Sequence, residues 1–242
     1  MGQAGEVDPQ PRIAVIAAMR QELQPFAARL SLRPRPGSIA SLVGGYAGRA
    51  EVIAGITTMG TGPAAEFTDR VLRSYQVDHV IGIGIAGGIG PTVAIGDLVV
   101  PELVVDGESG VELRPVPIDG HRPRGTLMTS DALVSDKGAV LALESDGVIA
   151  VDMETSAIGA ACERHGVPWS VLRAISDHAR DIEIDEALVG LARPDGSADP
   201  AAVARFLLTR PRRIPHLVTL GRGMRAAAHR SSAAAARACT RY

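Results

Sequence analysis

The sequence predicts an α/β fold, in which helices cover both faces of a central β-sheet. Three observations carry this prediction: short apolar runs alternate with segments of helical periodicity, several of these runs are apolar on both faces, and the chain is rich in small aliphatic residues. Of the 242 residues, 46% are hydrophobic but only 3% are aromatic, and 27 are glycine. A chain of this length can bury a substantial core in one compact domain, and this core must consist mainly of Ala, Val, Ile and Leu.

Six runs of apolar residues are typical of buried strands. Strands in a sheet that is covered on both sides are nearly continuous in apolar residues, because helices exclude water from each face. We expect strands at Ile13–Ala18, Glu51–Thr57, His79–Ile85, Asp97–Val100, Gly147–Val151 and Trp169–Ile175.

Four segments with helical periodicity lie between or after these strands. They are Gln21–Leu30, Pro63–Tyr75, Thr155–His165 and Pro200–Leu208. The stretch Pro101–Arg124 is rich in Pro, Gly and charge with little periodicity, so we expect a long surface connection there, or partial disorder. The tail that begins at Pro211 carries repeated arginines and then a run rich in Ala, Ser and Arg, which predicts a helix that frays towards the end of the chain.

Charge and cysteine content exclude several classes of protein. The formal net charge of -2 and the pI near 6.3 leave no broad basic surface for phosphate backbones, so we expect a small-molecule partner and no nucleic acid. The two cysteines, Cys162 and Cys239, are no framework for a disulfide-stapled secreted protein. No uncharged apolar run reaches the roughly 20 residues of a membrane span, and the first residues lack the features of a signal peptide. We therefore expect a cytoplasmic protein without a membrane span.

Three glycines in one predicted strand have the spacing of a dinucleotide-binding loop. Gly82, Gly84 and Gly87 match G-x-G-x-x-G, but the residues after Gly87 do not open a helix whose N-terminus could bind pyrophosphate. We therefore do not favour a Rossmann cofactor site. The glycines favour a strand end at which the backbone comes close to a ligand, although a tight turn between strands would also explain them.

Three acidic residues each follow an apolar strand, which is where α/β proteins place ligand-binding groups. Glu22 follows the first predicted strand, Glu154 the fifth and Asp177 the sixth. A carboxylate at each place could accept from sugar hydroxyls, orient a water molecule or donate a proton to a leaving base. The alternative is structural: Glu22 and Glu154 would complement helix dipoles in first turns, and Asp177 would cap a turn. Taken together with the glycine segment, the three favour a functional site.

At these positions the sequence resembles the nucleoside phosphorylase and nucleosidase superfamily, most closely the methylthioadenosine/S-adenosylhomocysteine nucleosidases. The resemblance runs from about Ile13 to about Ala179 and implies a three-layer fold with a central twisted mixed β-sheet between helices. It also implies a homodimer or higher homo-oligomer. From the length and the composition we expect one domain over residues 12–225, with flexible termini at 1–11 and 226–242. The motifs of the resemblance are Ala17-Ala18-Met19-Arg20-Gln21-Glu22, Ala86-Gly87-Gly88 with Gly96-Asp97, Val151-Asp152-Met153-Glu154, and Arg173-Ala174-Ile175-Ser176-Asp177.

The resemblance also implies a role for each carboxylate. Asp177 would protonate purine N7 as the bond to the sugar breaks, and Glu154 would accept from the ribose 2′ and 3′ hydroxyls. Glu22, with Arg173 nearby, would activate the attacking water. For Asp177 to be the acid, its pKa must lie above the ordinary value, which partial burial would achieve. No cofactor and no metal ion are expected. The implied substrate-binding residues are Met19, Ala86, Gly87, Leu133, Val134, Met153, Glu154 and Ser176.

The leaving base and the acceptor can also be inferred. Family members that act on 6-oxopurines often carry Asn where this chain has Asp177, so adenine is favoured as the leaving group. Phosphorolysis needs several cationic donors, and the phosphorylases that resemble this family place an arginine near the glycine segment. In this chain Val80–Gly90 contains no arginine. Glu22 would also repel phosphate, so water is favoured as the acceptor. Arg20, two residues before Glu22, is evidence for phosphate as the acceptor, unless its side chain is an exposed one in the first turn of the helix. We therefore expect a hydrolase that acts on 5′-methylthioadenosine, S-adenosylhomocysteine or 5′-deoxyadenosine.

Departures from the family pattern leave two alternatives open. Ile85 stands where the nucleosidases usually have Ser, Leu133 stands where an aromatic residue commonly stacks on adenine, and Pro101–Arg124 lacks the usual aromatic contacts to the 5′ group. Beyond Asp177 the chain resembles the hopanoid-associated phosphorylases, through Arg193-Pro194-Asp195-Gly196, Asp199, Val203 and Pro211–Leu220. One alternative is thus a phosphorylase of the hopanoid-associated (adenosyl-hopane) or purine nucleoside type. The other is a non-catalytic nucleoside-binding module.

Overall fold

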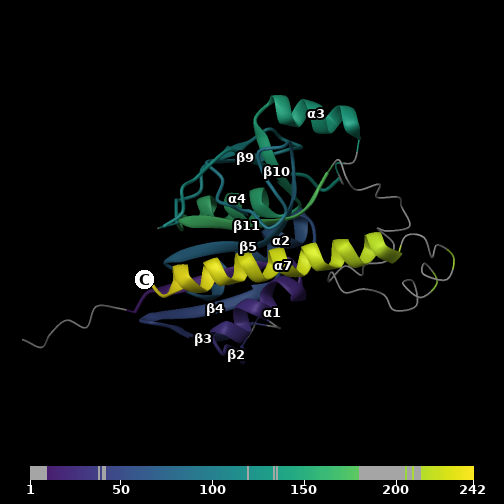
Figure 1. Cartoon of the computed structure of the whole chain (residues 1–242). Coiled ribbons are helices and arrows are strands. Elements are labelled where there is room, and N and C mark those ends of the chain that lie inside the picture. The colour runs from purple at the N-terminus through teal and green to yellow at the C-terminus, as the bar shows by residue number, and fades with distance from the viewer. Residues whose placement is uncertain are drawn as a thin grey trace, which may run out of the picture.

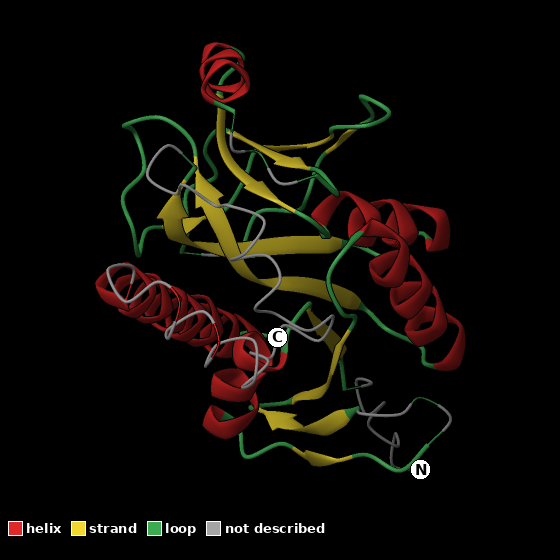
Figure 2. Cartoon of the chain, turned by 90° about the vertical axis from the view of Figure 1, so that its right-hand side faces the viewer, coloured by secondary structure: helices red, strands yellow, loops and turns green. Residues whose placement is uncertain are grey.

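A mixed, twisted β-sheet with helices on both faces forms the centre of the molecule (Figure 1, Figure 2). The computed structural model describes residues 10–37, 39, 42–118, 120–132, 134, 136–179, 205, 209 and 214–242. The predicted α/β class is confirmed. The helices in this part of the chain are α1 (Arg20–Arg29), α2 (Thr61–Ser74), α3 (Lys137–Ser145), α4 (Thr155–His165) and α7 (Ile214–Cys239). Its strands are β1 (Arg12–Ala17), β2 (Arg33–Pro34), β3 (Val43–Ala47), β4 (Ala50–Ile56), β5 (His79–Gly88), β6 (Leu98–Val99), β7 (Leu103–Asp106), β8 (Glu112–Leu113), β9 (Thr126–Thr129), β10 (Val148–Asp152) and β11 (Trp169–His178).

Strand β5 is the hub of the sheet. It runs parallel to β1 on one side and parallel to β11 along most of its length. Its last residues pair antiparallel with β10, with Gly87 opposite Val151. The carboxyl ends of β1, β5, β10 and β11 therefore meet in one region, which is where open α/β sheets bind ligands.

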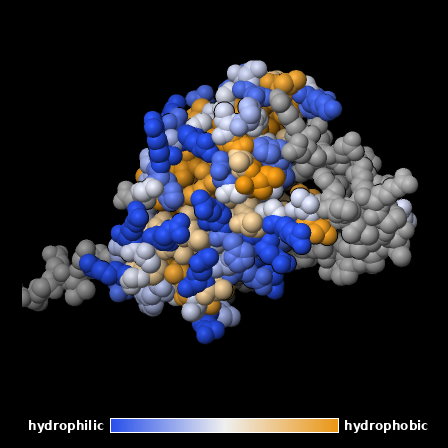
Figure 3. Space-filling view, viewed as in Figure 1, coloured by the Kyte–Doolittle hydropathy of each residue, from blue (hydrophilic) through white to orange (hydrophobic). Residues whose placement is uncertain are grey.

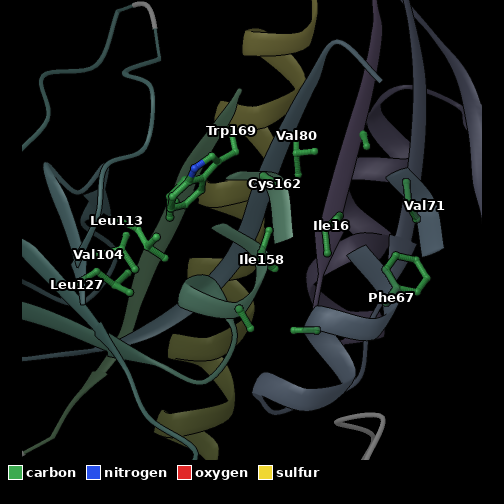
Figure 4. Packing of buried hydrophobic residues seen from close by; sticks show 14 of the residues in the cluster. Ile16, Phe67, Val71, Val80, Val104, Leu113, Leu127, Ile158, Cys162 and Trp169 are labelled. Atoms are coloured by element: carbon green, nitrogen blue, oxygen red, sulfur yellow. The ribbon is translucent and has the colours of Figure 1, made fainter. Parts of the chain in front are cut away.

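Two hydrophobic layers fill the space between the sheet and its helices. Successive residues of β1 point to opposite faces, so Ile16 packs in the layer under α2 and α4, whereas Val15 packs in the layer under α1 and α7. Figure 4 shows the first layer, with Phe67 of α2 and Ile158 of α4. This alternation produces the three-layer arrangement of helix, sheet and helix.

The stretch Pro101–Arg124 differs from the long surface connection that was expected. It contains β7 and β8, which form an antiparallel pair, and β7 also pairs in parallel with β9. The buried residues Val104 and Leu113 attach this pair to the core. Periodicity missed it because the two strands span only four and two residues.

The expectation that 226–242 is a flexible terminus is corrected by the structure. Helix α7 continues to Cys239, and its inner side is buried against β11, β5 and α1 (Figure 1). The buried side chains include Ala234, Ala235 and Cys239, which are small enough for the helix to approach the sheet closely. Arg230 and Arg237 lie on the exposed side, and the face of the molecule over α7 carries many hydrophilic side chains (Figure 3). The alanine run forms a helix because alanine has the highest helix propensity. The helix packs against the sheet because its buried side chains are small.

Some expectations lie outside the described residues. These are the predicted helix Pro200–Leu208 apart from Arg205, the terminus before residue 10, and most of the segment that resembles the hopanoid-associated phosphorylases. Within the described part of the chain, no helix is long and apolar enough to cross a membrane.

Candidate active site

A cavity of about 290 Å³ opens where the carboxyl ends of β1, β5, β10 and β11 meet. Of the predicted site residues, Arg173 lies buried behind the cavity, and Leu133 is outside the described residues. All the others line the cavity: Met19, Glu22, Ala86, Gly87, Val134, Met153, Glu154, Ser176 and Asp177. The fold thus brings together side chains that are up to 158 positions apart, from Met19 to Asp177.

Arg173 is the central cation of the site. It projects from β11, is only 1% exposed, and its Nη2 lies 2.6 Å from Asp152 Oδ2 and 3.3 Å from Glu154 Oε2. Its Nη1 lies 3.8 Å from Glu22 Oε1. Burial alone would lower the pKa of Arg173, but these three carboxylates outweigh burial and raise it. The guanidinium therefore stays charged, and it joins the ends of β1, β10 and β11 electrostatically.

Glu22 combines a structural contact with a position in the cavity. Its Oε2 accepts from the backbone N–H groups of Ala18 at 3.0 Å and Met19 at 2.9 Å, which caps α1, and its Oε1 accepts from the N–H of Ile85 in β5 at 2.8 Å. Burial raises the pKa of Glu22, while Arg173 and the three N–H donors oppose this rise. The helix-end explanation is thus correct for Oε2, but the same carboxylate also lines the cavity.

Glu154 occupies the N-cap position of α4 but does not cap that helix. Instead, its Oε1 accepts from the backbone N–H of Gly60 at 3.1 Å, and its Oε2 faces Arg173. Gly60 has a φ of 103°, a conformation that glycine adopts readily, and this turns its N–H towards the site. Burial raises the pKa of Glu154, and Arg173 opposes this.

Asp177 reaches the cavity because β11 contains a β-bulge. Ile175 pairs with Ala86 and Asp177 pairs with Gly87, so Ser176 is an extra residue between them. Bulges of this kind re-aim side chains and are frequent beside active sites. The Ser176 hydroxyl donates to Asp177 Oδ1, and burial raises the pKa of Asp177 in spite of this bond. The carboxyl group therefore holds a proton at a higher pH than an ordinary aspartate does.

The comparisons with known proteins agree with this geometry. The model of a family described as the phosphorylase superfamily matches residues 12–123 and 114–208. The chain belongs to this superfamily. It is 31% identical over 199 residues to the 5′-methylthioadenosine/S-adenosylhomocysteine nucleosidase of Chromohalobacter salexigens, a match that covers 69% of this chain and 85% of that protein. The predicted resemblance to nucleosidases, enzymes that hydrolyse an N-glycosidic bond, is thereby confirmed.

Two solved structures have the same fold as this chain. The 5′-methylthioadenosine/S-adenosyl homocysteine nucleosidase of Helicobacter pylori, complexed with a substituted pyrrolidin-3-ol, has a TM-score of 0.74 at 19% identity, and the match covers 97% of this chain and 100% of that chain. The S-adenosylhomocysteine nucleosidase of Streptococcus pyogenes also has a TM-score of 0.74, at 21% identity, and covers 98% and 99% of the two chains. The predicted three-layer fold is therefore confirmed.

The superfamily site also contains residues that were not predicted. Asp152 makes the shortest ion pair of Arg173, and it accepts from the hydroxyls of Thr129, at 2.8 Å, and Thr155. Asp152 could have been predicted from the sequence, because it belongs to the same motif as Glu154, Val151-Asp152-Met153-Glu154. The remaining unpredicted lining residues are largely apolar and come from β5, β10, α7 and several loops: Ala18, Met59, Ile85, Ser130, Ala132, Val151, Ala179, Leu220 and Met224.

The glycine segment explains how the buried ion pairs fit against β5. Gly82, Gly84 and Gly87 all lie inside that strand, and no helix begins after Gly87, so the geometry of a Rossmann loop is absent from this described segment. A Cβ at Gly84 would lie 2.2 Å from Arg173 Nη1 and 2.4 Å from Glu22 Oε1. Glycine at this position therefore leaves the room that both charged groups occupy.

Replacing Gly84 with Ala is expected to destabilise the protein by about 2 to 3 kcal/mol, because the new methyl group must displace a buried ion pair. Gly82→Ala is the matched control in the same strand, since its Cβ would meet neighbours only at 3.8 Å. We expect that control to change the free energy of unfolding by less than about 1 kcal/mol. Urea denaturation measures both values, and equal midpoints for the two variants would contradict the packing explanation.

Proposed function

We propose that this protein releases adenine from a 5′-modified adenosine by hydrolysing its N-glycosidic bond. The observation that carries the proposal is the convergence of Glu22, Glu154 and Asp177 on one cavity, with the ion-paired Arg173 behind them. Hydrolysis of a nucleoside needs a proton donor for the base, a hydroxyl acceptor for the sugar and a base for water. The three carboxylates differ in their surroundings in a way that suits these three roles.

Asp177 is the proposed general acid. A departing purine is a poor anion, so a proton delivered to N7 lowers the barrier, and a positioned acid contributes about 10²- to 10⁴-fold. Burial raises the pKa of Asp177, which supports this role, since the acid must be protonated when the substrate binds. The carboxyl group that accompanies N7 also favours a 6-aminopurine by the family pattern, so adenine is the proposed leaving base.

Glu154 is the proposed partner of the ribose. Two directed contacts, from Gly60 N–H and Arg173, hold its carboxylate at the cavity wall. A carboxylate there can accept from the 2′ and 3′ hydroxyls and can stabilise the positive charge that the sugar gains as the bond breaks. Met19 and Met153 line the same cavity and would pack against the sugar ring.

Glu22 is the proposed base for water. Burial raises the pKa of Glu22, but Arg173 and three backbone N–H donors oppose this rise and favour the ionised form that a base requires. The same contacts leave little support for phosphate as the acceptor. The guanidinium of Arg173 already faces three carboxylates, and Arg20 is exposed on the first turn of α1 and is not part of the described cavity lining.

The substituent at the 5′ position is proposed to be methylthio, homocysteinyl or hydrogen. Met59, Leu220 and Met224 give part of the cavity an apolar, adaptable lining, which suits a thioether. The 5′-methylthioadenosine/S-adenosylhomocysteine nucleosidase of C. salexigens acts on two nucleosides of this kind, according to its name. A cytoplasmic location and a homodimer or higher homo-oligomer also remain proposals. Light scattering of the purified protein would test the oligomeric state.

The deciding experiment follows the free base by chromatography. The purified protein is incubated with 5′-methylthioadenosine, S-adenosylhomocysteine, 5′-deoxyadenosine, adenosine and inosine, each with and without phosphate. We expect adenine release without phosphate, at an unchanged rate when phosphate is added, and little hypoxanthine. Strict dependence on phosphate would instead establish a phosphorylase, and binding of these nucleosides without release of base would establish a non-catalytic binding module.

A further inference from the structure

Two adjacent serines in the middle of α7 point into the molecule. Ser231 and Ser232 are 1% and 0% exposed, and they interrupt a run of alanines on the inner side of the helix. A serine inside a helix commonly bonds a carbonyl of the preceding turn of its own helix. Both of these hydroxyls instead bond other elements of the fold, and all of the groups they contact adjoin Glu22 or Arg173.

Ser231 bridges the two strands that carry the charged centre. Its hydroxyl donates to the carbonyl of Leu172 in β11 at 2.6 Å and accepts from the N–H of Gly84 in β5 at 3.1 Å. Leu172 directly precedes Arg173, and Gly84 directly precedes Ile85, whose N–H donates to Glu22 Oε1. The hydroxyl therefore fixes the peptides that aim both the arginine and the donor to Glu22.

Ser232 fixes the third element of the same arrangement. Its hydroxyl donates to the backbone carbonyl of Glu22 at 2.9 Å, across 210 residues of sequence. Helix α1 thus receives a contact from α7 at the very residue that reaches into the cavity. Ser231 and Ser232 together connect β5, β11 and α1 within one helical turn.

Helix α7 is also held against the other end of the site. A Cβ at Gly223 would lie 2.4 Å from the carbonyl oxygen of Ser176, the bulged residue beside Asp177, so the helix touches β11 there. Met224, the next residue, and Leu220, about one turn earlier in the helix, line the cavity. Figure 1 shows α7 lying along the sheet beside these strands. The helix therefore spans the site from the bulge to Glu22.

We propose that Ser231 and Ser232 are positioning residues, through which α7 holds the Glu22 carboxylate, its Ile85 donor and Arg173 in register for attack by water. The inference rests on the proposed hydrolytic function and extends it to α7, whose described contributions to the cavity lining, Leu220 and Met224, carry no charge. Removal of either hydroxyl lets β5, β11 and α1 shift relative to one another. Misplacement of a reacting group by about 1 Å can cost about 10²-fold in rate, so a partial loss of order has a measurable effect on kcat.

The test compares Ser231→Ala and Ser232→Ala with Thr68→Val. Thr68 is 0% exposed and donates only to Ala64 in its own helix, at 2.7 Å, so this control also deletes one buried hydroxyl without touching the site. We expect each serine variant to lower kcat about tenfold with KM changed less than about twofold, because ground-state binding by Glu154 and Asp177 is retained. The control is expected to keep the wild-type kcat.

The pH dependence of kcat/KM distinguishes a positioning role from a loss of stability alone, which would leave the pKa of Glu22 unchanged. The Ile85 N–H favours the ionised form of Glu22, so weakening that bond in Ser231→Ala raises the pKa of Glu22 further. Because the base must be ionised, the acidic limb of kcat/KM moves to higher pH. The charged groups that face Glu22, namely Arg173 and Glu154, are unchanged in the variant.

The outcomes separate the inference from the proposed function. If the wild type releases adenine and the serine variants match Thr68→Val in kcat and pH profile, the positioning role is refuted and the hydrolase stands. If the wild type releases no adenine from any nucleoside, the proposed function fails. The positioning role is then tested by carbon-13 NMR, in which the chemical shift of the Glu22 carboxyl carbon is followed as the pH changes and gives the pKa of Glu22. A higher pKa in Ser231→Ala than in the wild type then supports that role, and equal values overturn it.

Discussion

Replacing Asp177 with Asn is expected to lower kcat about 10²- to 10⁴-fold while the fold stays intact, because the variant loses its general acid. Asparagine has nearly the same size, and its carbonyl oxygen can still accept from the Ser176 hydroxyl. What it lacks is a proton that it can give to purine N7. Nucleoside binding should therefore survive, and the loss should be in kcat more than in KM.

The pH dependence of the wild-type enzyme provides an independent check of the same role. Burial raises the pKa of Asp177, and the acid works only while it is protonated. Activity with the bound substrate should therefore fall as the pH rises through this raised pKa, and it should persist above the pH at which an ordinary aspartate has lost its proton. In Asp177→Asn, the remaining activity should no longer show this basic limb.

Asp69→Asn is the matched control for this prediction. Asp69 lies on α2 and pairs with His165 and Arg164 on α4, at 3.0 and 3.3 Å, away from the cavity. Such exposed ion pairs contribute about 0 to 1 kcal/mol, so the control should fold and turn over like the wild type. Circular dichroism checks the fold of both variants, and a wild-type kcat in Asp177→Asn would remove Asp177 from the catalytic role.

Much of the sheet and of the cavity could be predicted, because strands buried on both faces leave continuous apolar runs in the sequence. These runs located β1, β5 and β11 to within a few residues. Glu22, Glu154 and Asp177 each follow such a run, and the parallel and converging strand ends bring them to one place. The apolar runs therefore placed each carboxylate at a strand end, and the superfamily motifs indicated that these strand ends form one site.

Other features depend on contacts between distant parts of the chain, which no local pattern encodes. The bulge at Ser176 is defined only by its pairing with β5. Ser231 points inward because it bonds residues 59 and 147 positions away in the sequence. The residues next to it in the sequence are mostly Ala, Ser and Arg, and they indicate only an exposed tail. Helix α7 has few large apolar residues and repeated arginines, which explains why its packing against the sheet was missed.

Replacing Glu22 with Gln is expected to abolish most turnover, by about 10²- to 10⁴-fold, because the amide cannot take a proton from water. The substitution also disturbs hydrogen bonding. Both carboxylate oxygens accept from backbone N–H groups, at Ala18 and Met19 on one side and Ile85 on the other. An amide has only one acceptor oxygen, so its NH₂ group must face an N–H donor in either orientation, at a cost of about 1 to 3 kcal/mol in stability.

Glu51→Gln separates the two effects in Glu22→Gln. Glu51 is half-buried on β4 and pairs with Arg12 and Arg35, at 2.7 and 2.5 Å, so the control removes a paired carboxylate of the same size outside the cavity. We expect it to lose some stability but to retain full kcat, measured at a temperature well below the unfolding midpoint of both variants. If Glu22→Gln retains wild-type turnover under the same conditions, water is activated by another group. If it instead loses activity only in proportion to the folded fraction, Glu22 acts solely as the cap of α1.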